Sequence, residues 1–296
     1  MGLEDTLSDW TGPSSDSEQE KQERTERMVR DAVDSHDAFD ECDLDIYAKG
    51  SYANNTNVRA DSDVDIAVEC TECVYWDTHE PGAYSGGSPY KGPWTPMRLR
   101  SELVAALRAK FGDQVDTSGN VAIQINSSTA RVDADVVPCF TFHYHFSETN
   151  YREGTKIFPI EGLGIVNYPA QQLEKGREKN VATGHAYKKA VRILKRIENA
   201  MAGDDYFREL PSYFVECLAY NWPNSLFNQP SWTALTRAGL FHVWDSLQGD
   251  EPNEEADRWL EANDCFYLFH DGQEWSRNDG REYAQAAWNY LELGDA

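Results

Sequence analysis

Residues 50–66 read GSYANNTNVRADSDVDI, and this stretch decides the predicted fold. Asp63 and Asp65 are two residues apart in a segment that alternates with the apolar residues Val64 and Ile66. Because successive side chains of a β-strand point to opposite faces of a sheet, we expect both carboxylates on one face and both apolar side chains in the core. Two carboxylates side by side on one strand form a candidate metal site.

Two further features of the sequence support a phosphate site here. Gly50 and Ser51 end the preceding predicted strand, where glycine lets the backbone approach a phosphate closely and the serine hydroxyl can donate to it. A polar loop is expected over residues 53–62. Farther along, RVDADVVPCF predicts a neighbouring strand that carries Asp133 and Asp135 on one face.

This combination of features favours a magnesium-dependent phosphoryl substitution. An isolated pair of aspartates is more often an incidental acidic face in so acidic a chain. Here the pair follows a Gly-Ser turn and precedes a strand that supplies a third carboxylate. Mg²⁺ prefers a few carboxylates together with substrate phosphates, and two such ions can hold the entering and leaving oxygens of an in-line substitution.

The composition limits the possible partners. The chain has 296 residues, with 51 Asp and Glu against 27 Lys and Arg, and a formal net charge of −24. This charge opposes binding to long nucleic acids, where cations supply most of the affinity, but allows a small phosphorylated ligand in a local basic pocket. The sequence contains neither an apolar run of about 18 residues nor a signal-peptide pattern. We therefore expect a cytoplasmic protein without a membrane partner.

The order of the predicted elements indicates an α+β fold of two parts. Strand patterns dominate residues 1–168, and helical patterns dominate residues 169–296. Within the first part, Thr95 and Pro96 supply the N-cap and the first position of a helix that ends at Gly112. We expect a mixed, mainly antiparallel sheet in the first part, packed against a helical lobe that completes a nucleotide cleft.

These motifs resemble a known family. Residues 50–66 resemble the GS…DxD motif of the nucleotidyltransferase superfamily that includes polymerase β, and ADVVPCF resembles its third-aspartate strand in oligoadenylate synthases. Three helical segments are similar to the cGAS/DncV-like nucleotidyltransferases (CD-NTases) of bacterial anti-phage signalling (CBASS), with clade E the most similar group. They are VNYPAQQLEKGREKN, YKKAVRILKR and LPSYFVECLAYNWPNS, and the whole resemblance spans about Lys49 to Ser225.

The resemblance implies roles for individual residues. Asp63 and Asp65 match the pair that binds two Mg²⁺ ions, with Mn²⁺ as an alternative, and Asp135 matches the third carboxylate, which leaves Asp133 as a neighbour. Gly50 and Ser51 match the residues that hold the terminal phosphates of the donor nucleotide.

One predicted helix bears a basic face. In YKKAVRILKR the apolar residues recur every three or four positions and leave Lys188, Arg192 and Lys195 on another face. On composition alone this face fits a solvated surface equally well. By resemblance, Lys188 matches the lysine that grips the donor triphosphate, and Ser212 matches the serine that joins it.

Two residues bear on the base of the nucleotide. By resemblance, Tyr213 matches the aromatic residue that stacks on a base, although its apolar neighbours are equally typical of a core tyrosine. Asn167 matches the residue that reads the base edge in the pyrimidine-using branch, since an amide can both donate to and accept from uracil. Apart from the resemblance, an asparagine before Tyr-Pro is typical of a turn.

The resemblance implies a cyclic oligonucleotide synthase. We expect it to join nucleoside triphosphates, UTP and ATP among them, into a cyclic dinucleotide that contains uridine, such as cyclic UMP-AMP or cyclic di-UMP. That product would act on a cyclic-nucleotide-responsive effector in anti-phage defence. Two alternatives stay open: a nucleotidyltransferase that modifies a small molecule, protein or RNA, and a catalytically silent nucleotide sensor.

Overall fold

The chain divides into two compact units in the computed structural model, which describes residues 2–13, 15–58, 63–87, 90–129 and 131–294. The unit that we call the sheet unit consists of Ser14–Ala53 and Arg59–Pro169. The unit that we call the helical unit consists of Met1–Pro13, Asn54–Val58 and Ala170–Ala296. The predicted parts, 1–168 and 169–296, differ from these units because residues 1–13 and 54–58 group with the helices. Residues 59–62 of the predicted polar loop lie outside the described residues.

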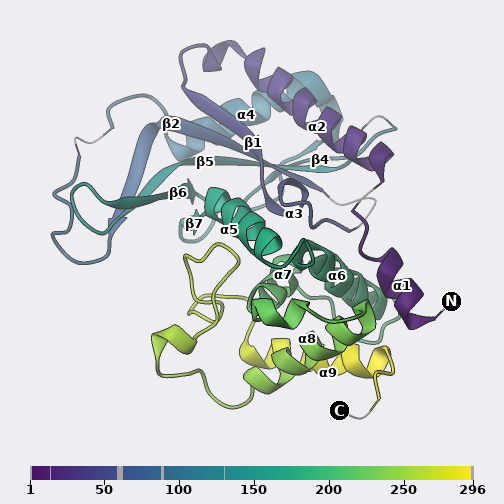
Figure 1. The fold of residues 1–296 in the computed structure, drawn as a ribbon. Helices are drawn as coiled ribbons and strands as arrows, with labels where there is room; N and C mark the ends of the chain where they lie inside the picture. Colours follow the sequence, from purple (N-terminus) through teal and green to yellow (C-terminus); the bar gives the residue numbers. More distant parts are fainter. Residues whose placement is uncertain (1, 14, 59–62, 88–89, 130, 295–296) are drawn as a thin grey trace. The chain divides into compact units, whose positions relative to one another are not determined.

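A sheet of seven strands forms the centre of the sheet unit (Figure 1). Its order is β1-β2-β5-β4-β3, with β6 paired to β5 and β7 paired to β6. The β2–β5 pair is parallel and the other pairs are antiparallel, which confirms the predicted mixed, mainly antiparallel sheet. The strands are β1 (Leu44–Ala48), β2 (Val64–Thr78), β3 (Val115–Asp116), β4 (Ile123–Ile125), β5 (Ala134–His145), β6 (Tyr151–Ile157) and β7 (Ile165–Asn167).

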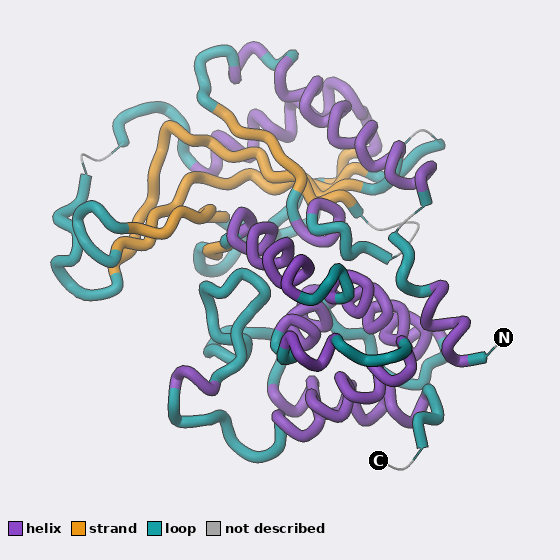
Figure 2. Tube along the Cα trace, viewed as in Figure 1, coloured by secondary structure: helices purple, strands orange, loops and turns teal. Residues whose placement is uncertain are grey.

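Helices occur in both units (Figure 2). The sheet unit contains α2 (Asp16–Asp34), α3 (Gly50–Ala53) and α4 (Pro96–Phe111). The helices of the other unit are α1 (Leu3–Asp9), α5 (Pro169–Ala182), α6 (Tyr187–Gly203), α7 (Ser212–Tyr220), α8 (Trp232–Ser246) and α9 (Arg277–Tyr290), and the first residue of α5 is the last of the sheet unit.

Local signals set the limits of α4. The hydroxyl of Thr95 accepts a hydrogen bond from the backbone N–H of Arg98 at 3.2 Å, and Pro96 occupies the first helical position. The helix ends at Phe111, and Gly112 follows with a φ of 59°. This positive φ favours glycine, so the predicted start and end of the helix are confirmed.

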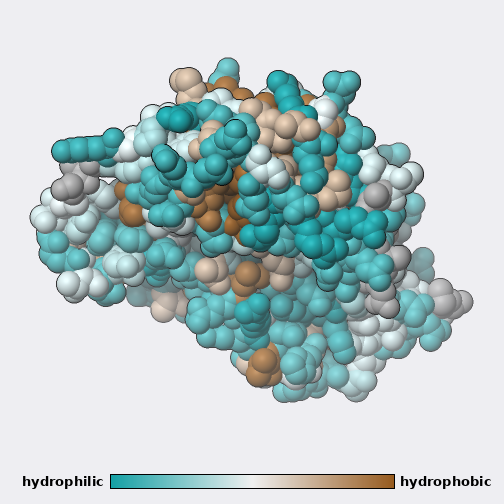
Figure 3. All heavy atoms as spheres, turned by 90° about the horizontal axis from the view of Figure 1, so that it is seen from above, coloured by the Kyte–Doolittle hydropathy of each residue, from teal (hydrophilic) through white to brown (hydrophobic). Residues whose placement is uncertain are grey.

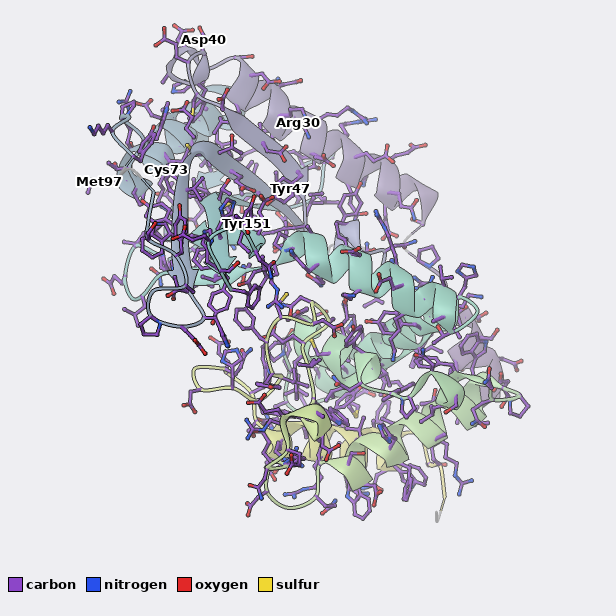
Figure 4. The ribbon with its side chains drawn as sticks, turned by 60° about the vertical axis from the view of Figure 1, so that its left-hand side comes forward. Arg30, Asp40, Tyr47, Cys73, Met97 and Tyr151 are labelled. Carbon is purple, nitrogen blue, oxygen red and sulfur yellow. The ribbon has the colours of Figure 1, made fainter. Side chains whose placement is uncertain are left out.

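Helices α2 and α4 cover one face of the sheet (Figure 1). The apolar side chains of β2 and β5 on this face, among them Ile66 and Val136, are buried in a core with both helices. Arg30 of α2 also donates to the carbonyl of Ile46 in β1, and Figure 4 shows Arg30 on the helix. The alternate residues of the same strands, including Asp65, therefore point to the opposite face of the sheet.

The parallel pair of β2 and β5 contains a bulge. Up to Cys70, which pairs with Phe140, the two strands run in one register. The next pair joins Val74 to Thr141, so three extra residues of β2 lie between the two pairs. From there β2 and β5 run together in a second register to their ends.

Helix α6 is central to the core of the helical unit, and the N-terminal helix α1 also belongs to this core. Leu7 of α1 has no exposed surface and packs among the buried side chains of the unit. Glu4 accepts hydrogen bonds from the backbone N–H groups of Trp232 and Thr233 at 2.9 and 2.7 Å, which caps the start of α8. The first turns of the chain therefore complete the helical unit.

The outer surface fits the acidic composition. Seen from above, it is mostly hydrophilic, with a few separate apolar patches (Figure 3). Met97, in the first turn of α4, projects into solvent with 82% of its surface exposed (Figure 4). No helix among the described residues is long and apolar enough to cross a membrane.

Replacing Leu7 with alanine should destabilise the helical unit by about 2–5 kcal/mol, because the substitution leaves a cavity in its core. The measurement is denaturant unfolding followed by tryptophan fluorescence. Leu163→Ala is the matched control, since this leucine is 89% exposed and its truncation should change stability by less than about 0.5 kcal/mol. Equal stability of the two variants would show that α1 is not part of the core.

Candidate active site

Two of the predicted carboxylates are direct neighbours in the sheet. Asp65 on β2 and Asp135 on β5 are Cα partners in the parallel register, so their side chains project from the same face. Asp63 comes one residue before β2 and is exposed. Because side chains alternate along an extended chain, we expect the side chain of Asp63 on the same face of the sheet as that of Asp65. The structure thus brings Asp65 and Asp135 together at the start of both strands.

The structure distinguishes Asp135 from Asp133. The carboxylate of Asp133 accepts a hydrogen bond from the backbone N–H of Ser127, which gives it a role in holding the chain before β5. By contrast, Oδ1 of Asp135 is buried and has no hydrogen-bond partner among the described residues. Burial raises the pKa of Asp135, and hydrogen bonding to Gln124 and the charge of Lys49 act in the opposite direction. A bound cation would satisfy this oxygen and favour the ionised carboxylate.

Asp65 and Asp135 fit a divalent cation that also binds a substrate. In the part of the chain that the structure describes, no three His, Cys, Asp or Glu side chains are grouped closely enough to form a cation site by themselves. Mg²⁺ is commonly held by one or two carboxylates, with phosphate oxygens and water as its other ligands. The pair and the unpartnered oxygen of Asp135 match that mode of binding.

Gly50 adjoins the aspartate pair. It begins α3 with a φ of 68°, a conformation that favours glycine. A Cβ atom at this position would overlap Oδ2 of Asp65, so glycine is needed for the close approach of the backbone to this carboxylate. From the sequence we expected this glycine to allow the close approach of a phosphate. The structure shows that it also makes room for the Asp65 carboxylate. Ser51 follows it in α3 and is half-buried.

Asn167 lies elsewhere in the sheet unit. It is the last residue of β7, where it pairs with Thr155 of β6 and is half-buried. Its carbonyl oxygen packs on Gly154, where a Cβ atom would come within 2.6 Å. The backbone of Asn167 is therefore fixed by the sheet, whereas its position before Tyr168 and Pro169 had suggested a turn.

The remaining three predicted residues are in the helical unit. Lys188 is half-buried near the start of α6, and its backbone N–H donates to Oδ1 of Asn180. Within the described residues its ammonium group forms no ion pair. Burial lowers the pKa of Lys188, and the charge of Glu216 partly offsets this effect. A partly buried ammonium group of this kind is suited to binding an anionic ligand.

The other two cations of the predicted basic face are structural. Arg192 and Lys195 are 6% and 2% exposed, so they do not form an open face with Lys188. The guanidinium of Arg192 donates to the carbonyl oxygens of Thr11 and Asn55 at 2.7 and 2.6 Å. Periodicity identified the face correctly as non-apolar but could not show that two of its charges have partners within the protein.

Lys195 is neutralised by Glu216, a residue that the sequence analysis did not single out. The ammonium nitrogen of Lys195 lies 2.9 Å from Oε2 of Glu216, and both side chains are almost fully buried. The same carboxylate accepts hydrogen bonds from Asn54 at 2.6 Å and from Thr56 at 2.7 Å. Burial alone would raise the pKa of Glu216, but Lys195 and these hydrogen bonds lower it below its ordinary value of 4.5.

This network places residues 54–58 in the helical unit. These residues follow α3 directly and form a turn and coil, as the predicted polar loop requires, but they are not solvated as such a loop usually is. Asn54, Thr56 and Asn57 are instead buried, and the first two bind the carboxylate of α7. The run of four polar residues at 54–57 was the only sequence signal, and such a run is far more common in solvated turns.

Ser212 and Tyr213 begin α7, one turn before Glu216. Ser212 is exposed. The Tyr213 ring is half-buried and meets the ring of Trp275 edge-on, with centroids 6.4 Å apart. Its hydroxyl group donates to Glu261 and accepts from Asn263, each at 3.2 Å. Tyr213 therefore has the contacts of a packed aromatic residue, with part of its surface still accessible.

Comparison with known proteins gives consistent matches over the whole chain. Residues 174–292 match the cGAS/DncV-like nucleotidyltransferase C-terminal helical domain. The chain is 32% identical over 293 residues to the cyclic dipyrimidine nucleotide synthase CdnE of Cecembia lonarensis, and 33% identical over 295 residues to that of Legionella pneumophila. Each alignment covers 98% of both proteins.

A solved structure agrees with these matches. The CdnE cyclic dinucleotide synthase of Elizabethkingia meningoseptica, solved with GTP and Apcpp, superposes with a TM-score of 0.81 at 29% identity. The superposition covers 97% of this chain and 98% of that one. The order of sheet and helices is therefore shared over nearly the full length of both proteins.

Replacing Glu216 with glutamine should cost about 3–5 kcal/mol of folding free energy, because the charge of Lys195 is then buried without a counter-charge. Unfolding of Glu216→Gln, Lys195→Met and the double variant should give a coupling energy above about 1 kcal/mol. Since the pKa of Glu216 is lowered on folding, its contribution is present above pH 4.5 and is lost as the pH falls through the folded-state pKa. Glu216→Gln should lack this acid sensitivity.

The exposed pair of Lys175 and Glu178, with its charged groups also 2.9 Å apart, is the matched control. Glu178→Gln should change stability by less than about 1 kcal/mol. Additive effects at Lys195 and Glu216 would contradict the importance of the buried pair.

Proposed function

The chain belongs to the cGAS/DncV-like nucleotidyltransferases, as its sequence motifs predicted, and we propose that within this family it joins UTP and ATP, or two UTP molecules, into a uridine-containing cyclic dinucleotide. One observation carries the proposal: Asp65 and Asp135 stand in register on two parallel strands, and Asp135 has a buried oxygen without a partner among the described residues. Such an arrangement suits a reaction driven by positioning and charge neutralisation.

Asp63, Asp65 and Asp135 are the proposed metal ligands. When bound, two Mg²⁺ ions, or Mn²⁺ in their place, would neutralise the triphosphate and polarise the oxygens that enter and leave at its α-phosphate. The acidic side chains would fix the site, and Asp135 would also orient the attacking ribose hydroxyl group and favour the loss of its proton. The bond from the ribose oxygen to phosphorus forms as pyrophosphate leaves, and a second round of the same step closes the ring.

The other proposed contacts hold the nucleotides. Lys188 and Ser212 would bind the triphosphate of the donor, because Lys188 forms no ion pair in the described part of the chain and Ser212 is exposed. Gly50 and Ser51 would approach its terminal phosphates from α3. Tyr213 would stack on a base. These assignments use the accessible polar groups and leave Arg192 and Lys195 to their structural partners.

The choice of base is proposed to depend on Asn167. Two relatives are named for dipyrimidine products, whereas the Elizabethkingia meningoseptica structure contains GTP and Apcpp. Sequence similarity alone therefore does not identify the bases of the substrates. An asparagine amide can donate to O4 and accept from N3–H of uracil. Because the sheet fixes the backbone of Asn167, its amide can read a base edge without a large loss of conformational freedom.

The proposed product is a second messenger of anti-phage defence, and its partner would be a cyclic-nucleotide-responsive effector. Such an effector would recognise the bases and the closed phosphodiester ring. The net charge of −24 supports small nucleotides, and not long nucleic acids, as the ligands of the enzyme.

Purified protein incubated with labelled NTPs and Mg²⁺ should form a phosphatase-resistant product that contains uridine, without any added acceptor. Chelation of the metal should stop the reaction. Asp135→Asn should lower the rate by at least about a hundredfold, since even partners outside the ligand set often contribute 10–100-fold. Mass spectrometry of the resistant product identifies its bases and ring size.

Asp133→Asn is the matched control, because it removes the same charge two residues before Asp135. The carboxylate of Asp133 binds the backbone N–H of Ser127. It should keep most of the activity once its folding has been verified by thermal melting. Loss of activity in Asp133→Asn but not in Asp135→Asn would identify Asp133 as the third metal ligand. A product that forms only with an acceptor would replace the proposed reaction by an acceptor-dependent transfer.

Asn167→Ser should lower the ratio of uridine to adenosine incorporation by about tenfold, because one hydroxyl group on a shorter side chain replaces the separate donor and acceptor groups of the amide. Competition between equal concentrations of UTP and ATP measures this ratio directly. An unchanged ratio would assign base recognition to another residue.

A further inference from the structure

The segment between α8 and α9 surrounds a buried acid that none of the proposed roles uses. It runs for 30 residues after Ser246 and has no helix other than a short 3₁₀ turn at Glu255–Asp257 (Figure 2). Glu261 in this segment is 5% exposed. A carboxylate is expensive to bury unless hydrogen bonds satisfy it, so its partners are informative.

The partners of Glu261 converge from the segment itself and from α7. Oε1 accepts a hydrogen bond from the side-chain amide of Gln273, and Oε2 accepts one from that of Asn263 at 2.8 Å. The Tyr213 hydroxyl donates to the same Oε2 at 3.2 Å. Asn263 also donates to the Tyr213 oxygen, which closes a triangle of three hydrogen bonds around the end of the tyrosine ring.

The triangle fixes the Tyr213 side chain in one orientation. A tyrosine side chain has two torsions, and the bonds at its far end, together with the edge-on contact to Trp275, restrict both of them. Since the ring is half-buried, its accessible surface is presented in a fixed direction. A stacking surface held in this way loses little conformational entropy when a base binds.

We infer that Glu261 is a positioning residue that holds the ring of Tyr213 for stacking against a nucleobase of a bound NTP. The inference rests on the stacking role of Tyr213 in the proposed function. Glu261 does not touch the nucleotide and acts through the Tyr213 hydroxyl. The loop between α8 and α9 thereby contributes to nucleotide affinity by fixing the orientation of the Tyr213 ring.

A second tyrosine on α7 provides a matched control. The hydroxyl of Tyr220, at the end of the same helix, donates to Oδ1 of Asp264 at 2.8 Å, in the same loop. It is the same type of bond between the same two elements. Tyr220 has no proposed contact with a nucleotide, so its loss tests the effect of helix–loop attachment alone.

The experiment compares Tyr213→Phe, Glu261→Gln and their double variant with Tyr220→Phe and Asp264→Asn. For each variant, KM and kcat are measured for UTP and ATP, Kd is measured by titration of each NTP with Mg²⁺, and thermal melting is recorded. Glutamine at position 261 has one acceptor oxygen in place of two, so it cannot satisfy Asn263 and Gln273 on both sides.

We expect Tyr213→Phe and Glu261→Gln each to raise KM and Kd for one of the two nucleotides by about three- to tenfold, with kcat within twofold of wild type. The double variant should resemble the single ones, because Tyr213→Phe removes the hydrogen bond to position 261 and Glu261→Gln disturbs the same network. Tyr213→Ala should weaken binding further, since base stacking is worth about fivefold or more. Tyr220→Phe and Asp264→Asn should lower the melting temperature without changing KM or Kd.

Other outcomes would overturn the inference. Unchanged KM and Kd in Glu261→Gln, with weakened binding in Tyr213→Ala, would show that the ring stacks without help from Glu261. If the variants at Tyr220 and Asp264 lost as much affinity as those at Tyr213 and Glu261, the effect would come from attachment of the loop to α7 in general. Unchanged binding in Tyr213→Ala would remove the stacking role itself. Wild-type protein that binds NTPs without forming product would refute the proposed function, while the Kd values would still decide the role of Glu261.

Discussion

The structure depends on one buried carboxylate. Glu216 has almost no contact with solvent, and a charge in that position is tolerated only if it is neutralised and fully hydrogen-bonded. Its partners are Lys195 on α6 and the side chains of Asn54 and Thr56. These requirements fix the path of the chain after Gly50, because residues 54–58 must enter the helical unit to satisfy the acid. The same carboxylate lies one turn after Ser212 and Tyr213 in α7, within the helical unit.

The sequence was sufficient where the deciding signals are local. The alternation around Asp63 and Asp65 and the pattern of RVDADVVPCF predicted two adjacent strands, and the structure pairs them with Asp65 opposite Asp135. The limits of α4 also followed from neighbouring residues, namely the threonine cap and the proline after it. The family motifs predicted both the fold and the enzyme class, because their order and spacing are specific.

Other features depend on contacts between distant parts of the chain. Asn54 and Glu216 are 162 residues apart, so no local pattern could show that the polar segment after α3 is buried. Arg192 and Lys195 look like solvent-facing cations on a helical wheel until their partners are known. The difference between Asp133 and Asp135 likewise depends on the backbone N–H of Ser127. It donates to Asp133, whereas Oδ1 of Asp135 has no partner among the described residues. In each case the missing information was the location of a partner.

The bulge in β2 has a consequence for how this protein can vary in evolution. One residue inserted between Asp65 and Cys70 would turn the following side chains to the wrong face of the sheet, and the carboxylates would lose their register with the buried face. Beyond the three extra residues, β2 pairs with β5 in a separate register. Insertions and deletions in the segment between β2 and α4 would therefore leave the aspartates in place. We therefore expect natural length variation to accumulate on the far side of the bulge, where a lineage could acquire new surface features without rebuilding its catalytic carboxylates.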